Sequence, residues 1–598
     1  MDELLAQAVR EGYLREIDLY AARFLHRIAS RPSPELLLGA ALASRAVGVG
    51  HICLPLPLIA GREVVQPGSG IRAPELDDWR PRLRESGVVG GEEGSEPLVL
   101  DDRDRLYLAR YHRCENLIAA DLLDRGRDLP AVRGDAASIL SRLFPDAAPD
   151  DRQRIAAAAA VLKKFLVISG GPGTGKTHTV ARIIALLQAL SGGGLRVALA
   201  APTGKAAARL QESVRGACRD MDTDLARFVE PEAATLHRLL GYSPATGGFR
   251  RNGERPLALD LLVVDEASMI DVPLMAALLE ALPKETRLIL LGDRDQLTSV
   301  EAGSLFGDIC SRVEPAWSDD FCSALERLTG FAPGTGGGSQ GFGDAVVLLT
   351  RSYRFAEGSG IGSLARTVNS GGEGIAELVR KLEGEDFRFV ESGDDRERVL
   401  LREAVRRGFA PCLEATGPED ALLALGRFRV LCALREGPFG VSGVNRLVEH
   451  TMREAGLIPP AEPWYKGRPL VIRSNHYGLE LFNGDTGVVW PDEEGRMRAW
   501  FFRADASLHP VPLSRLPEHE TAWAVTIHQS QGSEFDEVLL LLPDMESPVL
   551  CRELVYTGVT RARARLLVFA DPDLLAASVH QRVVRYSGLR EKLWGDGA

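Results

Sequence analysis

The stretch VISGGPGTGKTHTV, residues 167–180, predicts the fold of this chain more directly than any other segment. A β-branched run is followed by a glycine-rich turn, then by Lys176 and Thr177, then by apolar residues at helical spacing. Strand, G-x-x-x-x-G-K-[ST] and helix, in this order, are the parts of a P-loop. The glycines let backbone N–H groups approach phosphates, Lys176 would reach the β- and γ-phosphates, and the Thr177 hydroxyl would bind Mg²⁺. The stretch therefore predicts a nucleoside-triphosphate site, whereas a glycine turn that only ends a strand leaves Lys176 unexplained.

The composition is that of an ordinary globular protein. The chain has 598 residues, 45% hydrophobic and 26% charged, and this length suggests about four domains. No apolar run approaches the roughly 20 residues of a membrane helix, and the acidic start MDELLAQ is not a signal peptide. We expect a cytoplasmic protein without a membrane partner, in which the eight scattered cysteines are reduced thiols. The net charge of −12 argues against a generally adhesive nucleic-acid binder but is compatible with a local basic channel.

Changes of pattern divide the chain into an amino-terminal part and two α/β parts. Residues 1–140 carry apolar residues at helical spacing and predict a helical domain that docks onto a partner. Residues 141–328 alternate short β-branched runs with helical patterns, which predicts a parallel sheet with helices on both faces. Residues 329–344 are glycine-dense and predict a surface loop. A second α/β pattern covers residues 345–598.

Two insertions are expected within the α/β parts. Residues 241–258 are too short for a domain but fit a β-hairpin. Residues 460–520 alternate apolar and polar side chains and contain the tight-turn pairs NG (483–484) and EG (494–495), which is typical of a small antiparallel β-barrel. The predicted fold class is therefore α/β, with the barrel inserted in the second α/β part.

Two further strands end in polar residues that suit nucleotide hydrolysis. The segment LLVVDEASMID, residues 261–271, brings Asp265 and Glu266 to the carboxyl end of a strand, where Asp265 can hold Mg²⁺ through water and Glu266 can deprotonate the attacking water. The segment LLGDRDQLTSVEAGS, residues 290–304, places Gln296 on a turn, where its amide can report the γ-phosphate to neighbouring loops. Taken singly, a solvated acidic pair and an ordinary turn glutamine are the alternatives. Their order after the P-loop favours the catalytic interpretation.

A set of segments resembles, in order, the helicase motifs of superfamily 1: GGPGTGKT, APTGKAAARL, ATLHRLLG, VVDEASMID, LGDRDQLTSVEAGS, SYRF, TIHQSQGSEFDEV and ELVYTGVTRAR. They lie between about residues 153 and 565. LCALREGPFGVSGVN and the amino-terminal ASRAVGVGHICLPL further resemble the RecD family, the alpha subunits of exodeoxyribonuclease V. The resemblance implies two RecA-like domains with ATP and Mg²⁺ between them, an N-terminal helical domain, and an SH3-like barrel in the second RecA-like domain.

The resemblance also implies roles for single residues of the ATP site. Gln153 matches a glutamine that reads adenine, Arg354 and Arg561 match arginines that reach the γ-phosphate from the second domain, and Gly532 and Glu534 match residues near the sugar and phosphates. The residues expected to bind ATP are Gln153, Gly170, Gly171, Pro172, Gly173, Thr174, Gly175, Lys176, Thr177, Gly532 and Glu534. The residues expected to act in hydrolysis are Lys176, Glu266, Gln296, Arg354 and Arg561, with Thr177 and Asp265 on the metal. The alternative for Arg561 is a surface arginine within an R-x-R-x-R run.

Further residues match family positions that face single-stranded DNA: Thr203, Lys205, Thr235, His237, Thr526 and His528. Hydroxyls and a few cations suit tracking along phosphates without base readout. Either histidine could instead be a satisfied core histidine. A hairpin such as residues 241–258 separates the DNA strands in relatives. His178 and the length of the loop 329–344 depart from the family pattern.

Together these matches imply an ATP-dependent helicase that moves 5′→3′ on single-stranded DNA. It would be the alpha subunit of a RecBCD-type complex, with RecB-like beta and RecC-like gamma partners, acting at duplex ends in double-strand break repair and recombination. We find no nuclease signature in the sequence and expect exonuclease activity of the beta-type partner. A free-standing 5′→3′ helicase and a non-catalytic ATP-binding clamp on DNA are the alternatives. The amino-terminal segment argues against the first, and Lys176, Glu266, Gln296 and both arginines argue against the second.

Overall fold

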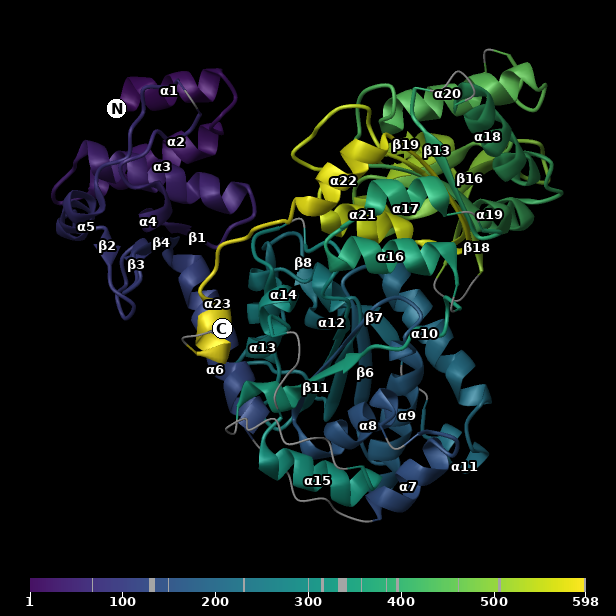
Figure 1. Ribbon diagram of the computed structural model, residues 1–598, viewed down its shortest axis with the longest axis horizontal. Helices are drawn as coiled ribbons and strands as arrows, with labels where there is room; N and C mark the ends of the chain where they lie inside the picture. The colour runs from purple at the N-terminus through teal and green to yellow at the C-terminus, as the bar shows by residue number, and fades with distance from the viewer. Residues whose placement is uncertain are drawn as a thin grey trace.

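Two parallel sheets flanked by helices form most of the molecule, and an amino-terminal module lies beside the first of them (Figure 1). The computed structural model describes residues 1–598 apart from 67, 128–134, 149, 230–231, 300, 313–316, 332–340, 357, 383, 394–396, 461, 504–506 and 596–598. The glycine-dense loop expected at residues 329–344 therefore lies mostly outside the described residues. Among the described residues, no helix is both long enough and apolar enough to cross a membrane.

The amino-terminal module combines helices with a small sheet. Its helices are α1 (Asp2–Arg10), α2 (Glu16–Ile28), α3 (Pro34–Gly48), α4 (Leu56–Ile59) and α5 (Leu76–Glu85). Its strands, in the spatial order β1-β4-β3-β2, are β1 (Cys53–Pro55), β4 (Arg105–Leu108), β3 (Leu98–Leu100) and β2 (Val89–Gly90). The expectation of a helical domain missed this sheet, because strands this short do not show a period of two residues.

Helix α6 (Ala109–Arg127) carries the chain from this module to the first α/β unit. Its Ile118 and Leu122 are buried in one core with Phe165 of the first sheet. The next helix, α7 (Ala136–Leu143), packs against helices of the same unit. By packing, the amino-terminal module thus ends where α6 begins rather than at residue 140. Helical spacing continues across both positions, so the sequence pattern shows no break.

The first sheet has the order β12-β5-β11-β10-β6-β7, and all neighbouring strands are parallel. These strands are β5 (Phe165–Gly170), β6 (Val197–Ala201), β7 (Ala233–Thr235), β10 (Leu261–Val264), β11 (Arg287–Gly292) and β12 (Val346–Leu349). Besides α7, the helices of this unit are α8 (Arg152–Leu162), α9 (Lys176–Leu190), α10 (Gly204–Arg219), α11 (Thr223–Ala226), α12 (Leu236–Leu240), α13 (Val272–Ala281), α14 (Leu305–Ile309) and α15 (Asp319–Thr329), with 3-10 turns η1 (Ala267–Met269) and η2 (Phe342–Ala345). The order of β5, β6, β10 and β11 places their carboxyl ends at one edge, as the alternating pattern predicts.

Strand β12 corrects one predicted boundary. The second α/β part was expected to begin at residue 345, but Val346 pairs with Val167 of β5, so this strand belongs to the first sheet. The run VVLL suits a buried strand of either sheet, and its composition does not indicate which. The hairpin expected at residues 241–258 is confirmed by β8 (Tyr242–Ser243) and β9 (Gly248–Phe249), which pair antiparallel.

The second sheet has the order β13-β22-β21-β14-β20 and is also parallel. Its strands are β13 (Phe387–Glu391), β14 (Phe428–Cys432), β20 (Ala524–Thr526), β21 (Phe535–Leu541) and β22 (Ala562–Ala570). Its helices are α16 (Gly360–Ser370), α17 (Ile375–Lys381), α18 (Glu397–Leu413), α19 (Pro418–Arg427), α20 (Val441–Glu454), α21 (Arg552–Val559) and α22 (Pro572–His580), with the 3-10 turn η5 (His528–Ser530).

An antiparallel sheet is inserted between α20 and β20, within the predicted range 460–520. Its order is β18-β17-β16-β15-β19. The strands are β15 (Pro469–Ile472), β16 (Thr486–Pro491), β17 (Met497–Phe502), β18 (Leu508–Pro512) and β19 (His519–Thr521), with 3-10 turns η3 (Tyr477–Leu479) and η4 (Leu513–Arg515). Gly484 and Gly495 of the two predicted tight turns have φ of 93° and 78°, which favours glycine at both positions.

The carboxyl-terminal segment returns from the second α/β unit to the beginning of the chain. Figure 1 shows it running from α22 to α23 (Leu589–Trp594), which lies beside α6. The Gly588 N–H and the Lys592 Nζ both donate to the buried Glu115 of α6, each at 2.8 Å. Ser587 Oγ donates to Asp308 Oδ2 of α14 at 2.7 Å. The last helix is therefore fixed to the first unit, not to the second.

Candidate nucleotide-binding cleft

The P-loop joins β5 to α9, and its glycines are required by both space and conformation. Gly173 and Gly175 have φ of 72° and 80°. A Cβ on Gly173 would lie 2.2 Å from Cβ of Arg354, and one on Gly175 would lie 2.3 Å from Nε2 of Gln153. Helix α9 begins at Lys176, directly after the loop. Its free N-terminal N–H groups therefore face the space where phosphates are expected.

Lys176 lies folded against the strand from which the loop departs. Its Nζ donates to the carbonyl oxygens of Gly170 at 2.5 Å and Gly171 at 3.2 Å. Gln153, on α8, donates from Nε2 to the Thr174 carbonyl at 3.0 Å, so it contacts the loop backbone directly. The lysine must leave its two carbonyls in order to reach a phosphate.

Asp265 and Glu266 follow β10 at the same edge of the sheet. The Glu266 N–H donates to Asp265 Oδ1 at 2.8 Å. Glu266 has φ of 52°, an uncommon conformation for a non-glycine residue, which turns its side chain into the cleft. Burial, and next the neighbouring Glu266, raises the pKa of Asp265, while Lys176 opposes that rise. A divalent cation at this position would favour the ionised carboxylate.

Gln296 and Arg561 connect the two α/β units beside the loop. Gln296 Nε2 donates to Asp293 Oδ2 at 2.9 Å, and Arg561 Nη2 donates to Gln296 Oε1 at 2.6 Å. Arg561 also donates from Nη1 to the Ser533 carbonyl at 3.1 Å and is only 2% exposed. It is not the surface arginine of the alternative interpretation.

Arg354 and Glu534 lie on the same side of the cleft. Arg354 follows a segment that contacts the P-loop, since the Tyr353 N–H donates to the Gly173 carbonyl at 2.8 Å. Glu534 pairs with Arg354, Arg209 and Arg563. These charges hold the pKa of Glu534 at about 2, against the opposing effect of burial.

The predicted residues line one cavity of about 210 Å³ between the two units. Its walls include Pro172, Gly173, Thr174, Gly175, Lys176, Thr177, Asp265, Glu266, Gln296, Arg354, Gly532, Glu534 and Arg561. Gly170 and Gly171 lie beneath Lys176, and Gln153 lies behind the loop. The Thr177 hydroxyl and the Asp265 carboxylate are the oxygen donors expected for Mg²⁺, which usually takes one or two protein ligands besides phosphate and water. The donor set and the glycine cradle thus fit a Mg²⁺–nucleotide.

Sequence reasoning missed three residues of this cleft. Arg209 lines the cavity and pairs with Glu534. Asp293 and Tyr556 are buried beside the loop, and the Tyr556 hydroxyl donates to Asp293 Oδ2 at 3.2 Å. Spacing could have indicated Arg209, because it lies four residues after Lys205 on one helix and shares its face. No sequence pattern indicates Tyr556, and only the fold shows that it lies beside Asp293.

The residues predicted to face DNA lie at strand ends, in different environments. Thr203 and Thr235 cap α10 and α12, accepting from the N–H groups of Ala206 and Arg238, each at 3.2 Å. Lys205 is exposed, with its Nζ 5.8 Å from the ring centre of Phe535.

The remaining three predicted DNA residues differ in exposure. His237 is exposed and packs on Tyr242 and Phe249 of the hairpin, with ring centres 5.6 and 5.8 Å away. It is therefore not a core histidine. Thr526 is buried and bonds with Gln529. Burial lowers the pKa of the half-buried His528.

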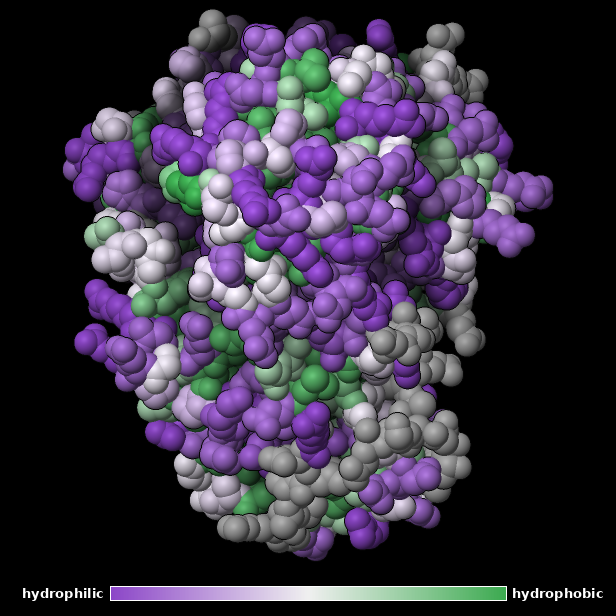
Figure 2. Space-filling view, turned by 90° about the vertical axis from the view of Figure 1, so that its left-hand side faces the viewer, coloured by the Kyte–Doolittle hydropathy of each residue, from purple (hydrophilic) through white to green (hydrophobic). Residues whose placement is uncertain are grey.

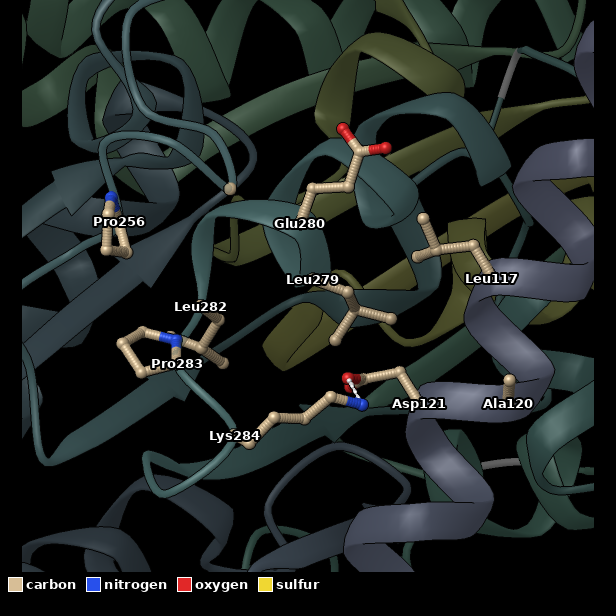
Figure 3. Close-up of a pocket in the computed structure, with 10 residues that line it drawn as sticks. Leu117, Ala120, Asp121, Pro256, Leu279, Glu280, Leu282, Pro283 and Lys284 are labelled. Atoms are coloured by element: carbon tan, nitrogen blue, oxygen red, sulfur yellow. Dashed lines mark ion pairs between the residues drawn. The ribbon is translucent and has the colours of Figure 1, made fainter.

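A second cavity, of about 450 Å³, lies between α6, α13 and residues 253–256 (Figure 3). Leu117, Leu279 and Leu282 give it apolar walls, and the Asp121–Lys284 ion pair (3.0 Å) closes one side. None of the predicted nucleotide or DNA residues lines this cavity. The residues predicted to act in ATP hydrolysis line the first cleft instead.

Family profiles match three parts of the chain. The profile described as RecBCD enzyme subunit RecD, N-terminal domain, matches residues 10–107. An AAA domain profile matches residues 153–302, and a UvrD-like helicase C-terminal domain profile matches residues 521–569. The amino-terminal module and both α/β units are thus each matched.

Curated relatives match the chain over most of its length. The RecBCD enzyme subunit RecD of Mycobacterium tuberculosis (strain ATCC 25618 / H37Rv) is 41% identical over 98% of this chain and 96% of its own. That of Mycolicibacterium smegmatis is 39% identical over 97% of both chains. The ATP-dependent RecD2 DNA helicase of Deinococcus radiodurans is 33% identical over 72% of this chain and 50% of its own.

Solved structures align more weakly. Bacteroides Pif1 bound to ssDNA covers 72% of this chain and 94% of its own, with a TM-score of 0.34 and 17% identity. At that level the assignment rests on the sequence relatives, two of which are matched nearly from end to end. With its cleft, its motifs and these relatives in agreement, the chain belongs to the RecD family of RecBCD enzyme subunits.

Proposed function

We propose that this chain is an ATP-dependent DNA helicase, the alpha subunit of a RecBCD-type complex, which moves 5′→3′ along single-stranded DNA from duplex ends. One observation carries the proposal: Arg561 of the second α/β unit lines the same cleft as Lys176 and Glu266 of the first, beside Arg354 of the segment that joins β12 to α16. Arginine of the second α/β unit thus meets the P-loop of the first. A nucleotide in the cleft would contact both units, so its hydrolysis would change how they sit together.

The residues of the cleft have complementary roles in this proposal. The loop N–H groups and Lys176 bind phosphates, and Thr177 and Asp265 hold Mg²⁺, which neutralises phosphate charge when bound. Glu266 takes the proton of the attacking water. Arg354 and Arg561 stabilise charge on the transferring phosphoryl group, because a guanidinium is always charged and presents a rigid fork.

The finer features of the fold belong to the same proposal. The two parallel sheets would be RecA-like domains, the antiparallel sheet an SH3-like barrel, and β8–β9 a pin that separates strands. Lys205, His237 and His528 offer exposed or half-exposed groups at the strand ends along which DNA would pass. Thr203, Thr235 and Thr526 would act chiefly by shaping the backbone there, because their hydroxyls already have partners.

Unwinding by the purified complex tests the catalytic part. Duplexes with a 5′ or a 3′ single-stranded tail are compared for the wild type and for Lys176→Gln. We expect the variant to lose unwinding of the 5′-tailed duplex and DNA-stimulated ATP hydrolysis by this chain. Lys381→Gln is the matched control, since Lys381 lies on an exposed helix face, its side chain 72% exposed. Unchanged hydrolysis in Lys176→Gln would reject the site assignment and leave the non-catalytic clamp.

The amino-terminal module offers a surface for a protein partner. On α2, Ile17, Tyr20, Phe24 and Ile28 are 59%, 60%, 52% and 48% exposed. Their spacing places them on one face of the helix, while Leu19, Ala22 and Leu25 of the opposite face are buried. Figure 2 shows the side of the molecule on which this module lies, with hydrophobic groups reaching the surface between hydrophilic ones. An apolar stripe of this kind is typical of a protein interface.

We assign this stripe to the gamma-type subunit. Phe24→Asp is expected to remove that subunit, and with it the beta-type subunit, when the tagged chain is purified from its native cell. Glu93→Lys reverses a charge on an exposed position between β2 and β3 of the same module, outside the stripe, and should retain both partners. A wild-type chain that purifies without large partners would instead favour the free-standing helicase.

A further inference from the structure

Tyr556 of α21 reaches from the second α/β unit to the P-loop. Its hydroxyl donates to Asp293 Oδ2 at 3.2 Å, and the residue is 4% exposed. A Cβ on Gly171 would lie 2.9 Å from that hydroxyl oxygen, so the phenol touches the loop itself. The Gly171 carbonyl is also an acceptor of the Lys176 ammonium. The Tyr556 phenol, the P-loop and Lys176 therefore lie close to the buried Asp293 carboxylate.

Three side chains act on the Asp293 carboxylate: Tyr556, Gln296 and Lys176. Asp293 directly follows the strand β11 and accepts from Tyr556 and from Gln296 on the same oxygen. Burial raises the pKa of Asp293, and the charge of Lys176 opposes that rise, so the lysine lies near enough to influence the carboxylate. When Lys176 turns toward a phosphate, the charge beside Asp293 changes. Tyr556, from the second unit, contacts Asp293 directly.

Tyr556 and Arg561 connect residues 293–297 of the first unit to α21 and the turn that follows it. Arg561 donates to Gln296, and Tyr556 donates to Asp293, three residues earlier in the chain. In a third bond, the Leu297 N–H donates to Thr557 Oγ1 at 3.0 Å. Asp293, Gln296 and Leu297 are therefore all bonded to α21 or to the turn after it. A shift of this segment would move the helix and the arginine as one body.

Tyr556 is suited to this role as a permanent donor. Burial raises its pKa well above that of a free phenol, so the hydroxyl keeps its proton. Whenever the Asp293 carboxylate is ionised, this O–H donates a charge-assisted hydrogen bond to it, which is stronger than a bond between neutral groups.

We propose that Tyr556 is a positioning residue that couples occupancy of the P-loop to the second α/β unit, by holding α21 and Arg561 in register with Asp293 and Gln296. This inference rests on the proposed ATPase function. The hydroxyl performs no chemistry on the nucleotide. It determines whether the change around Lys176 is transmitted to the unit that carries Arg561.

Tyr556→Phe in the complete complex tests the inference, because the ring and its packing are kept. The contribution of this chain is isolated by subtracting the rate of the complex that carries Lys176→Gln. We expect KM for ATP within about twofold of wild type, kcat lower by roughly tenfold, and fewer base pairs of 5′-tailed duplex unwound per ATP hydrolysed. Asp293→Asn should give the same phenotype, and the double variant should be little worse than either single one.

Tyr465→Phe is the matched control for a purely structural effect. Tyr465 is 1% exposed and donates to Glu449 Oε1 at 2.7 Å, so it loses an equivalent buried phenol–carboxylate bond without a link to the P-loop. It should lower thermal stability yet leave the ratio of base pairs to ATP unchanged. Wild-type kcat and coupling in Tyr556→Phe, or losses equal to those of Tyr465→Phe, would overturn the inference. A complex whose hydrolysis and unwinding of the 5′-tailed duplex are unchanged by Lys176→Gln would instead reject the proposed function itself.

Discussion

Arg354 forms an ion pair with Glu534, with 2.5 Å between Nη2 and Oε1. Its other terminal nitrogen, Nη1, is buried and has no hydrogen-bond partner among the described residues. In the cleft, the Arg354 guanidinium therefore has one terminal nitrogen paired with Glu534, and the other lacks a hydrogen-bond acceptor among the described residues. A phosphate oxygen would supply the missing acceptor, and Glu534 would orient the arginine toward it.

Glu534→Gln is expected to destabilise the protein by about 2–4 kcal/mol, because it leaves three guanidinium groups beside a neutral amide. Thermal melting measures the effect. Glu537→Gln is the control, since the partner of Glu537, Arg407, has a side chain that is 60% exposed. An exposed pair of this kind contributes about 0–1 kcal/mol. Equal, small shifts in both variants would show that the three arginines do not depend on Glu534.

Asp308 is expected to make stability fall as pH rises. Burial raises its pKa to about 7, against about 3.9 in an unfolded chain. The folded state thus binds the proton more tightly, and this stabilisation, complete below about pH 4, is lost as pH rises through 7. Asp308→Asn should reduce the difference in melting temperature between pH 5 and pH 8. The exposed Asp536→Asn should not, and an identical pH profile in both variants would contradict the assignment.

Glu266→Gln should bind ATP with nearly wild-type affinity yet hydrolyse it about 10²–10⁴ times more slowly, because an amide cannot accept the proton of water. Binding of a fluorescent ATP analogue and steady-state hydrolysis separate the two effects. Glu326→Gln, on the exposed side of α15, should change neither. A variant that loses affinity and rate together would place Glu266 in nucleotide binding rather than in proton transfer.

Lys205→Gln should weaken single-stranded DNA binding in a salt-dependent way. One phosphate contact fewer lowers the slope of log K against log salt by about 0.7. Titrations at several salt concentrations, with Lys381→Gln as the control, measure it. If affinity falls by the same factor at every salt concentration, Lys205 acts on the shape of the protein and not on a phosphate.

The local chemistry of the cleft was predictable from the sequence, because each motif sits directly after its own strand. Lys176 follows β5 and Glu266 follows β10, and parallel strands bring their carboxyl ends to one edge. The order of the motifs along the chain therefore predicts that their side chains lie close together. Local composition was enough to place these residues, and the structure adds their partners.

Pairings between distant segments were not predictable in the same way. The run at β12 suits either sheet, and only its register with Val167 assigns it to the first. Tyr556 reads as an apolar position of a short helix until α21 is seen against Asp293. Arg209 has no sequence neighbour that indicates Glu534, more than three hundred positions away along the chain. In each case the interaction is set by how two elements pack, which a local pattern does not encode.

The attachment of α23 to α6 limits how far the second α/β unit can travel. Segment 581–588 joins α22 to α23, and at about 3.4 Å per residue it spans at most about 27 Å when fully extended. Arg585 of this segment donates to the carbonyls of Glu301 and Gly303, and the Tyr586 carbonyl accepts from the Ile52 N–H, so a wider opening of the cleft would have to break these bonds before it reached α23. This carboxyl-terminal connection therefore limits how far the two α/β units can separate.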